Sequence, residues 1–170
     1  MKTQIIGYSG SGKSTLAAKI AQTQQIPVLH LDCVHWLPGW QERDRNETSE
    51  IVRTFLDTHD AWVIDGNYTK HSYDRRMQEA DRIIFMNFNR FSCLWRAIMR
   101  RIRYHGRTRA SITEGCNERI SFEFLRFMFL TSRNKRAKAR YRTLSQQYAD
   151  KFITIRNQRE LDRFVQQERL

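Results

Sequence analysis

The octapeptide Gly7-Tyr8-Ser9-Gly10-Ser11-Gly12-Lys13-Ser14 constrains the fold of this 170-residue chain more than any other feature. It matches the pattern G-x-x-x-x-G-K-[ST] in full. It also lies between an apolar strand-like run and a segment of helical periodicity, as that pattern requires. In such a loop, successive backbone N–H groups and the N-terminus of the following helix point at phosphate oxygens. The phosphate loop, residues 7–14, therefore predicts a site for a nucleoside triphosphate, with Mg-ATP as the expected ligand.

Two side chains of the phosphate loop have separate expected roles. Lys13 is expected to reach the β- and γ-phosphates as a point charge, and the hydroxyl of Ser14 is expected to ligate Mg²⁺. The remaining contacts are expected to come from backbone N–H groups and small side chains. The residues predicted to bind the triphosphate are Gly7, Ser9, Gly10, Ser11, Gly12, Lys13, Ser14 and Thr15.

Short apolar runs alternate with segments of helical periodicity, which predicts βαβ units and a parallel sheet covered by helices on both faces. No linker divides the chain, so we expect one domain over residues 1–170, a three-layer α/β phosphate-loop NTPase fold around five parallel strands. Segment Cys33–Trp40 is expected to be irregular. The expected strands are Lys2–Tyr8, Val28–Leu31, Trp62–Ile64, Arg82–Asn87 and Lys151–Ile155. The expected helices are Lys13–Gln24, Glu42–Thr58, Tyr73–Ala80, Phe91–Tyr104, Glu118–Tyr148 with a break near 132–134, and Arg159–Gln167.

The composition argues against several classes of protein. No apolar stretch reaches the roughly 18 residues that a membrane span needs, and no secretory signal is recognisable before the first strand. Cys33, Cys93 and Cys116 are odd in number and fit no zinc-binding spacing. We therefore expect a cytoplasmic protein with reduced thiols and no membrane partner.

Charge is unevenly distributed along the chain, whose formal net charge is +12. Residues 1–81 hold nine Lys/Arg and eleven Asp/Glu, whereas residues 82–170 hold twenty-one and seven, a net charge of +14. A half this basic predicts an anionic partner, and a polyphosphate, a nucleic acid and an acidic surface all qualify. Solvated basic helix faces are the alternative interpretation.

Two acidic residues follow expected strands, at the edge where parallel α/β sheets bind ligands. Asp65 ends the third strand, a position from which an acid holds Mg²⁺ in phosphate-loop proteins, although it can instead cap the bend at Gly66-Asn67. Asp32 ends the second strand and can take a proton from an acceptor hydroxyl or orient it, or else cap a loop.

Aromatic residues follow Asp32 closely in the sequence. Trp36, Leu37 and Trp40 can form an apolar wall for a substrate, or they can cover the edge of the sheet. His35 can face the same pocket, whereas His30 is expected to pack within its strand.

The expected helix Phe91–Tyr104 carries a stripe of arginines with no acid nearby. Such guanidinium groups repel one another unless an anion binds them, and arginine suits bidentate phosphate contact. Arg100 is therefore a candidate for stabilising a γ-phosphoryl group in transfer. The stripe comprises Arg96, Arg100, Arg103 and Arg107, and a separate stripe expected to face the core comprises Phe91, Leu94, Trp95, Ile98 and Ile102. A second basic wall is possible from Arg133, Lys135, Arg136, Lys138, Arg140 and Arg142.

The GYSGSGKST loop, the acid-ending strands and the arginine helix together resemble adenylate kinase and its relatives among the small phosphate-loop kinases. This resemblance implies a nucleoside- or nucleotide-kinase-like fold with a mobile helical lid over about residues 103–140. It places Asp65-Gly66 at a magnesium-linked position, Arg96 against the adenine and Arg100 on the phosphates. Asn157, after the last strand, falls where the family builds part of its adenine pocket.

The acceptor side departs from that pattern. Asn67-Tyr68-Thr69-Lys70 stands where adenylate kinases have a Pro-Arg whose arginine holds the acceptor nucleotide, which argues against AMP as acceptor. Segment 31–36 is closer to small-metabolite kinases with an acid after the second strand. Nearly end to end, the chain resembles the bacterial family named DNA topology modulation proteins, a name that implies an influence on DNA supercoiling. The matching strings are LHLD, HWLPGW, WVIDGNY and FNRFSCLWRAIMRRIRYHGRTR.

The chain is therefore predicted to be a phosphotransferase that uses ATP and Mg²⁺, with a small hydroxyl or phosphate compound as acceptor. Lys13, Asp32 and Arg100 are the predicted catalytic residues, and Ser14 and Asp65 are the predicted magnesium ligands. The alternative is a nucleic-acid-binding ATPase or regulator that affects DNA topology. It is less favoured because such modules usually add exposed aromatic residues or a groove-reading helix, and the sequence shows neither plainly. Binding of ATP for structure alone is a third possibility.

Overall fold

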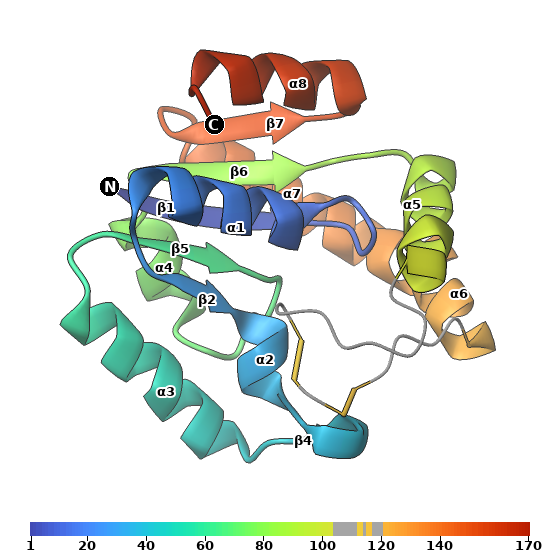
Figure 1. The fold of residues 1–170 in the computed structure, drawn as a ribbon, viewed down its shortest axis with the longest axis horizontal. Helices are drawn as coiled ribbons and strands as arrows, with labels where there is room; N and C mark the ends of the chain where they lie inside the picture. Colours follow the sequence, from blue (N-terminus) through green and yellow to red (C-terminus); the bar gives the residue numbers. More distant parts are fainter. Residues whose placement is uncertain (104–111, 114, 117–120) are drawn as a thin grey trace.

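A five-stranded parallel sheet lies at the centre of the structure, a computed structural model that describes residues 1–103, 112–113, 115–116 and 121–170. The strands lie in the order β2-β5-β1-β6-β7 (Figure 1). The central strand β1 pairs with both β5 and β6, and β2 and β7 form the edges. The predicted parallel sheet is confirmed, with its strands at β1 Lys2–Gly7, β2 Val28–His30, β5 Trp62–Asp65, β6 Arg82–Met86 and β7 Phe152–Ile155.

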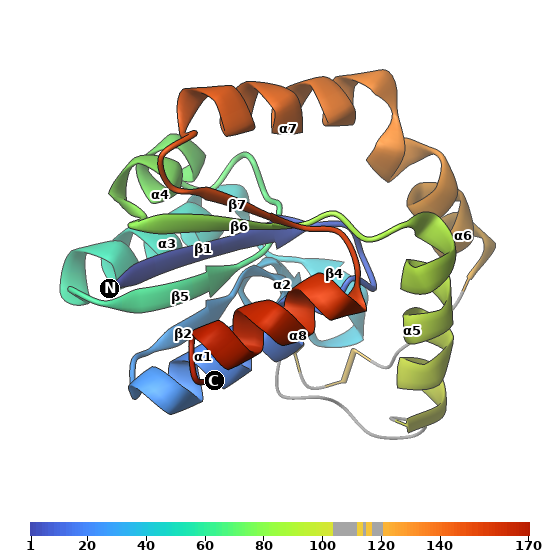
Figure 2. The ribbon, with the colours of Figure 1, turned by 90° about the horizontal axis from the view of Figure 1, so that it is seen from above.

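Helices cover both faces of this sheet, as predicted for a three-layer α/β fold. Figure 2 shows α1 (Lys13–Gln24) and α8 (Gln158–Gln167) on one face, and α4 (Tyr73–Glu79) and α7 (Lys135–Gln147) on the other. Each face of the sheet is therefore shielded from water by amphipathic helices.

Burial along the strands follows from this layering. Strands β5 and β6 are buried at every residue, and β1 is buried from Thr3 onward, because helices cover these central strands on both faces. The edge strand β2 is only partly buried at all three residues. Ile5, Ile64 and Ile84 are fully buried side chains at the centre of the core.

Helix α3 (Arg45–Thr58) begins three residues later than the sequence predicts. The side chain of Asp44 caps it, because a carboxylate oxygen accepts hydrogen bonds from the backbone N–H groups of Asn46 at 2.8 Å and Glu47 at 3.1 Å. The acidic cap, rather than the start of the polar run at Glu42, therefore sets where the helix begins.

The segment predicted to be irregular is in fact ordered into short elements. The strand β2 ends at His30, and Leu31–His35 forms the helix α2, with Asp32 in its first turn. A small antiparallel hairpin follows, because Pro38-Gly39 turns the chain with a φ of 77° at the glycine. Its parts are β3 (Trp36–Leu37), the short 3-10 helix η1 (Pro38–Trp40) and β4 (Gln41–Glu42).

Helices α5 (Arg90–Arg103) and α6 (Phe122–Phe129) stand beyond the carboxyl ends of the strands (Figure 1). The helix predicted over 118–148 comprises α6, a 3-10 turn η2 (Thr131–Arg133) and α7, so the predicted break near 132–134 coincides with η2. The predicted lid of about 103–140 lies partly outside the residues that the structure describes. Arg107, the last residue of the predicted arginine stripe, lies outside them as well.

The predicted core face of α5 is wrong for its largest residues, although Leu94 is partly buried and packs against the core. The large side chains of Phe91, Trp95 and Ile102 are 72%, 64% and 64% exposed, and the buried residues of the helix are instead Cys93 and Ala97. Small side chains are needed on that face because α5 packs directly against the backbone of the phosphate loop. No helix in the described part of the chain is both long and apolar enough to span a bilayer.

Candidate active site

The phosphate loop is tightly enclosed by the elements around it. A Cβ atom at Gly10 would lie 2.4 Å from the carbonyl oxygen of Cys93 on α5, and one at Gly7 would lie 2.5 Å from that of Met86 on β6. Both glycines also have positive φ angles, of 76° and 141°. The loop therefore requires glycine at these positions for backbone conformation and for space.

Most of the predicted triphosphate-binding residues line one large cavity at this edge of the sheet. Within it, the ammonium group of Lys13 donates to the carbonyl of Tyr8 at 3.2 Å, so its side chain lies back over the loop. Gly7 and Ser11 do not line the cavity, and Ser11 is fully buried beneath it. The residues of the loop and the start of α1 that do line it are Tyr8, Ser9, Gly10, Gly12, Lys13, Ser14 and Thr15.

Asp65 lies at the end of β5, where it is 5% exposed. Its Oδ2 atom is 3.1 Å from Nδ1 of His30, a contact between strand ends that sequence reasoning did not predict. Burial raises the pKa of Asp65, but the hydrogen bond with His30, the charge of Lys13 and the hydroxyl of Ser14 outweigh burial, so the pKa lies below its usual value. The carboxylate is therefore charged at neutral pH.

The surroundings of Asp65 fit a magnesium site. Its buried Oδ1 atom has no hydrogen-bond partner among the residues described, and a buried carboxylate oxygen rarely lacks one. Ser14, the other predicted ligand, is close enough to Asp65 to lower its pKa. A carboxylate and a hydroxyl are hard oxygen donors of the kind that Mg²⁺ prefers beside substrate phosphates.

Asn67 ties the end of β5 to the start of the phosphate loop. Its side-chain carbonyl accepts from the backbone N–H of Gly7 at 2.9 Å, and its side-chain amide donates to the carbonyl of Gly7. The pairing of β1 with β5 ends at Ile5 and Asp65. Beyond that point, the two hydrogen bonds from the Asn67 side chain satisfy the backbone N–H and carbonyl of Gly7.

Arginines from α5 and α7 form the wall beside the phosphate loop. Arg96 donates to the carbonyl of Ser11 at 3.0 Å and lies over the ring of Phe88, with 4.2 Å between the guanidinium carbon and the ring centroid. Its other nitrogen donates to the side chain of Gln158. The predicted adenine-stacking residue therefore also anchors the loop. The cavity-lining arginines are Arg96, Arg100, Arg103, Arg136 and Arg140.

Arg133, from the second predicted basic cluster, is not part of that wall. Its guanidinium lies 3.6 Å over the ring of Tyr8 and donates to the carbonyl of Phe88 at 2.8 Å. Arg133 therefore joins the turn η2 to the phosphate loop. Within the same cluster, the side chains of Lys135, Lys138 and Arg142 are exposed and lie outside the cavity lining.

Asn157, the predicted adenine contact, caps helix α8. Its side-chain oxygen accepts from the backbone N–H of Glu160 at 3.0 Å, and its amide donates to the carboxylate of the same residue at 2.9 Å. The neighbouring Gln158 lines the cavity and contacts Arg96. The role predicted for Asn157 in holding the adenine remains a prediction.

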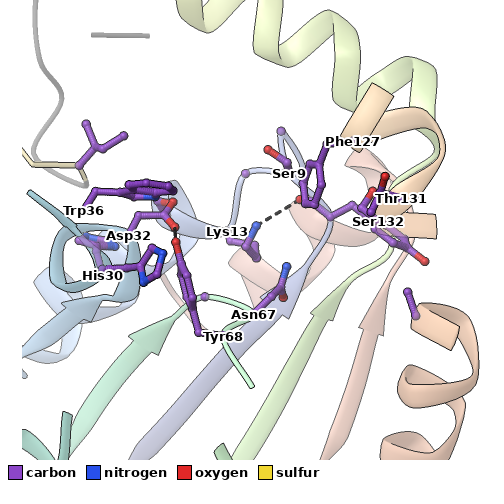
Figure 3. Close-up of a pocket in the computed structure, with 18 of the residues that line it drawn as sticks. Ser9, Lys13, His30, Asp32, Trp36, Asn67, Tyr68, Phe127, Thr131 and Ser132 are labelled. Carbon is purple, nitrogen blue, oxygen red and sulfur yellow. Dashed lines mark hydrogen bonds between the residues drawn. The ribbon is translucent and has the colours of Figure 1, made fainter. Parts of the chain in front are cut away.

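Asp32 faces the opposite end of the cavity, on helix α2. The hydroxyl of Tyr68 donates to Oδ1 of Asp32 at 2.9 Å (Figure 3). Burial, followed by the negative charge of Asp32, raises the pKa of Tyr68 far above its usual value, so the hydroxyl remains a donor at any physiological pH. No residue in the described ranges hydrogen-bonds the second oxygen, Oδ2.

Aromatic rings surround Asp32. The ring of His35 lies 4.5 Å from that of Tyr68 and 4.7 Å from that of Trp36, between centroids, and Trp36 lies 5.5 Å from Trp40. Trp36 and Trp40 line the cavity, which supports the substrate-wall interpretation over simple covering of the sheet edge. Thr113 donates to the carbonyl of Cys33 at 3.1 Å, so this residue lies against the aromatic end.

The loop that carries Tyr68 is held from below by a buried arginine. The guanidinium of Arg76 is fully buried and donates to the carbonyls of His71, at 2.9 Å, and of Tyr68, and to the side chain of Gln4 at 3.0 Å. Burial lowers the pKa of Arg76 to about 10, which still leaves it charged at neutral pH. Its two donations to carbonyls fix the backbone of residues 68–71, and the third ties the guanidinium to β1 through Gln4.

The cavity as a whole has a volume of about 1850 Å³ and contains both the phosphate loop and Asp32. Ligand sites typically occupy roughly 300–1,000 Å³, so there is room for two ligands side by side. Figure 3 shows Asp32 and Trp36 on one side of Lys13, and Phe127, Thr131 and Ser132 on the other. Sequence reasoning missed Tyr68, Asn67 and Arg76, although their proximity to Asp65-Gly66, at a strand end, was a usable signal.

Comparison with known proteins gives structural neighbours only. No family model and no curated protein matches this sequence, so the resemblance to DNA topology modulation proteins stays a prediction. A gluconokinase from Sinorhizobium meliloti 1021 is 17% identical with a TM-score of 0.49, covering 91% of this chain and 81% of its own. A deoxyadenosine kinase from M. mycoides, solved with products dCMP and a flexible dCDP bound, is 13% identical with a TM-score of 0.47, covering 91% and 90%. Both neighbours are kinases.

Proposed function

We propose that this protein transfers the γ-phosphoryl group of ATP to a hydroxyl group of a small acceptor. The observation that supports this most is that a complete phosphate loop and Asp32 line the same cavity from opposite ends, with one oxygen of Asp32 unengaged by any residue that the structure describes. A hydrolase, or a protein that binds ATP only for structure, does not need an aromatic wall at the far end of the cavity. We also propose that residues 1–170 form one domain, with a lid over about 103–140.

The step is an in-line displacement at the γ-phosphorus. The hydroxyl oxygen of the acceptor bonds to phosphorus, the bond from phosphorus to the bridging oxygen of ADP breaks, and the hydroxyl proton passes to Oδ2 of Asp32. Lys13, with Arg100 on the same wall, stabilises the negative charge on the transferring group. Ser14 and Asp65 would hold Mg²⁺, which when bound neutralises charge on the phosphates.

The experiment that tests this proposal is a measurement of ADP release from Mg-ATP with a panel of nucleosides, nucleotides, sugars and hydroxy acids. An acceptor that raises turnover well above the hydrolysis background, with the phosphorylated product identified by mass spectrometry, is the expected result. A panel in which turnover never exceeds that background would contradict the proposal.

A second candidate function is binding of single-stranded nucleic acid, which one structural observation favours. The sequence pattern placed Phe91 and Trp95 on a core face, but both are exposed on the arginine-bearing helix α5. Exposed rings beside arginines are platforms on which bases stack. Fluorescence anisotropy with a labelled oligonucleotide should then show tight binding that weakens steeply with salt and is reduced by Trp95→Leu. Binding no tighter than that of an unrelated basic protein at about 150 mM salt argues against it.

A further inference from the structure

The two ends of the cavity differ in charge. Six lining cations belong to the phosphate loop, α5 and α7, whereas the end around Asp32 has the two acids Asp32 and Glu42, with Lys70 as its lining lysine among the described residues. Burial, followed by the neighbouring His35, lowers the pKa of His71, so His71 adds no charge at neutral pH. The cations of the phosphate end are Lys13, Arg96, Arg100, Arg103, Arg136 and Arg140.

Two arginines near the Asp32 end, Arg76 and Arg43, are engaged with the protein itself. Arg76 points into the core, where its three donations go to Gln4, Tyr68 and His71. Arg43 donates to the carbonyl of Val34 at 2.8 Å and pairs with Glu47. Neither guanidinium lines the cavity, so neither is presented to an acceptor.

Among the described residues, this end presents aromatic rings and one carboxylate oxygen without a hydrogen-bond partner. The ring of His35 is tilted by 42° against that of Tyr68 and by 80° against that of Trp36, so the three rings form an angled aromatic wall next to Asp32. Tyr68 occupies Oδ1, which leaves Oδ2 without a donor among the described residues and available to an acceptor hydroxyl. The aromatic wall favours a planar ring through edge or face contacts. The described lining of this end has two acids against one lysine, which disfavours an anionic acceptor.

We propose that the acceptor is an uncharged alcohol that carries a planar ring, rather than a nucleoside monophosphate or a sugar acid. The ring packs against Trp36, and the hydroxyl lies on Oδ2 of Asp32. This inference rests on the proposed phosphotransferase function and specifies the substrate class of the same site.

Matched acceptor pairs test the inference through turnover. The pairs are adenosine with AMP, cytidine with CMP, and thymidine with TMP, with pyridoxine as a ring alcohol that is not a nucleoside and gluconate as a ring-free acid. We expect a nucleoside or pyridoxine to exceed every anionic acceptor by at least about tenfold in kcat/KM, the size of effect that a single unpaired charge produces. A monophosphate or gluconate as the best acceptor would overturn the inference while leaving the phosphotransferase proposal intact.

Equilibrium binding separates failure of this inference from failure of the proposed function. Titration calorimetry of the same pairs in the presence of Mg-ADP needs no turnover. Tighter binding of the ring alcohols than of their anionic partners supports the inference even if no phosphoryl transfer is found. Equal binding, or tighter binding of the monophosphates, overturns it.

Two aromatic-to-leucine variants locate the binding surface. Trp36→Leu should raise the KM for a ring alcohol roughly tenfold, from the loss of ring contacts, with the KM for Mg-ATP unchanged. Phe55→Leu, on α3 and outside the cavity lining, is the matched control and should leave both constants unchanged. A Trp36→Leu enzyme with an unaltered acceptor KM would also overturn the proposal.

Discussion

The phosphate end and the acceptor end of the cavity are built in different ways. At the phosphate end, the position of each group is set by backbone: glycines at positive φ, a helix N-terminus and a carbonyl of Ser11 that holds Arg96. At the acceptor end, positions depend on side chains, since Tyr68 orients Asp32 and buried Arg76 fixes the loop that carries Tyr68. A site built from backbone groups suits a ligand that does not vary, such as a triphosphate. A site built from side chains can be altered by single substitutions.

The largest effect is expected from Lys13→Ala at the phosphate end. Loss of this charge should lower kcat about a hundredfold to a thousandfold, because the transferring group loses a positioned cation. ADP release under saturating ATP measures it. Lys19→Ala, on the exposed side of α1, is the matched control and should behave as wild type. Equal activity of Lys13→Ala and wild type would show that the loop is not the catalytic phosphate site.

Asp32→Asn should separate the two ends. We expect kcat to fall about a hundredfold because no group accepts the hydroxyl proton, while the affinity for Mg-ATP is retained. Turnover and calorimetric ATP binding measure the two quantities, and exposed Asp60→Asn serves as control. A matching loss of ATP affinity would mean that Asp32 belongs to the phosphate end instead.

Arg76→Met tests whether the geometry of the acceptor end depends on the buried arginine beneath the Tyr68 loop. The substitution leaves three acceptors on Gln4, Tyr68 and His71 without their donor, so the free energy of unfolding should fall by about 3 kcal/mol. In the folded enzyme, the acceptor KM should rise more than the KM for Mg-ATP.

Urea denaturation and initial-rate kinetics measure the effects of Arg76→Met. The neighbouring Arg75→Met is the control, because Arg75 pairs with Asp57 and Glu79 at the surface and should contribute less than about 1 kcal/mol. Equal stability of the two variants would contradict a bracing role for Arg76.

The smallest effect concerns Asp65, whose pKa is lowered in the folded state. Such a group stabilises the fold above its unfolded pKa of about 3.9, and that contribution disappears as the pH falls through the lower folded value. Wild type should therefore lose more stability than Asp65→Asn as the pH falls from about 5 into the acid range. Urea denaturation across that range measures it, and identical pH dependence of the two proteins would contradict the lowered pKa.

The same contrast explains what could be predicted from the sequence. The phosphate loop, α1 and the strand-end position of Asp65 follow from local patterns, so the sequence predicted them closely. The contact of Tyr68 with Asp32 and that of Arg76 with Gln4 join segments 36 and 72 residues apart, which no local pattern encodes. The error on α5 has a similar cause: periodicity marked Phe91 and Trp95 as core, but the Gly10 backbone requires the smaller Cys93 on that face.

The central claim is that one cavity brings a phosphate donor and a hydroxyl acceptor together. It is tested most directly by following the label from [γ-³²P]ATP in the presence of a ring alcohol. We expect most of the released label on the acceptor, and we expect Asp32→Asn to slow this transfer about a hundredfold without abolishing ATP binding. Label that appears only as inorganic phosphate, whatever acceptor is present, would contradict it.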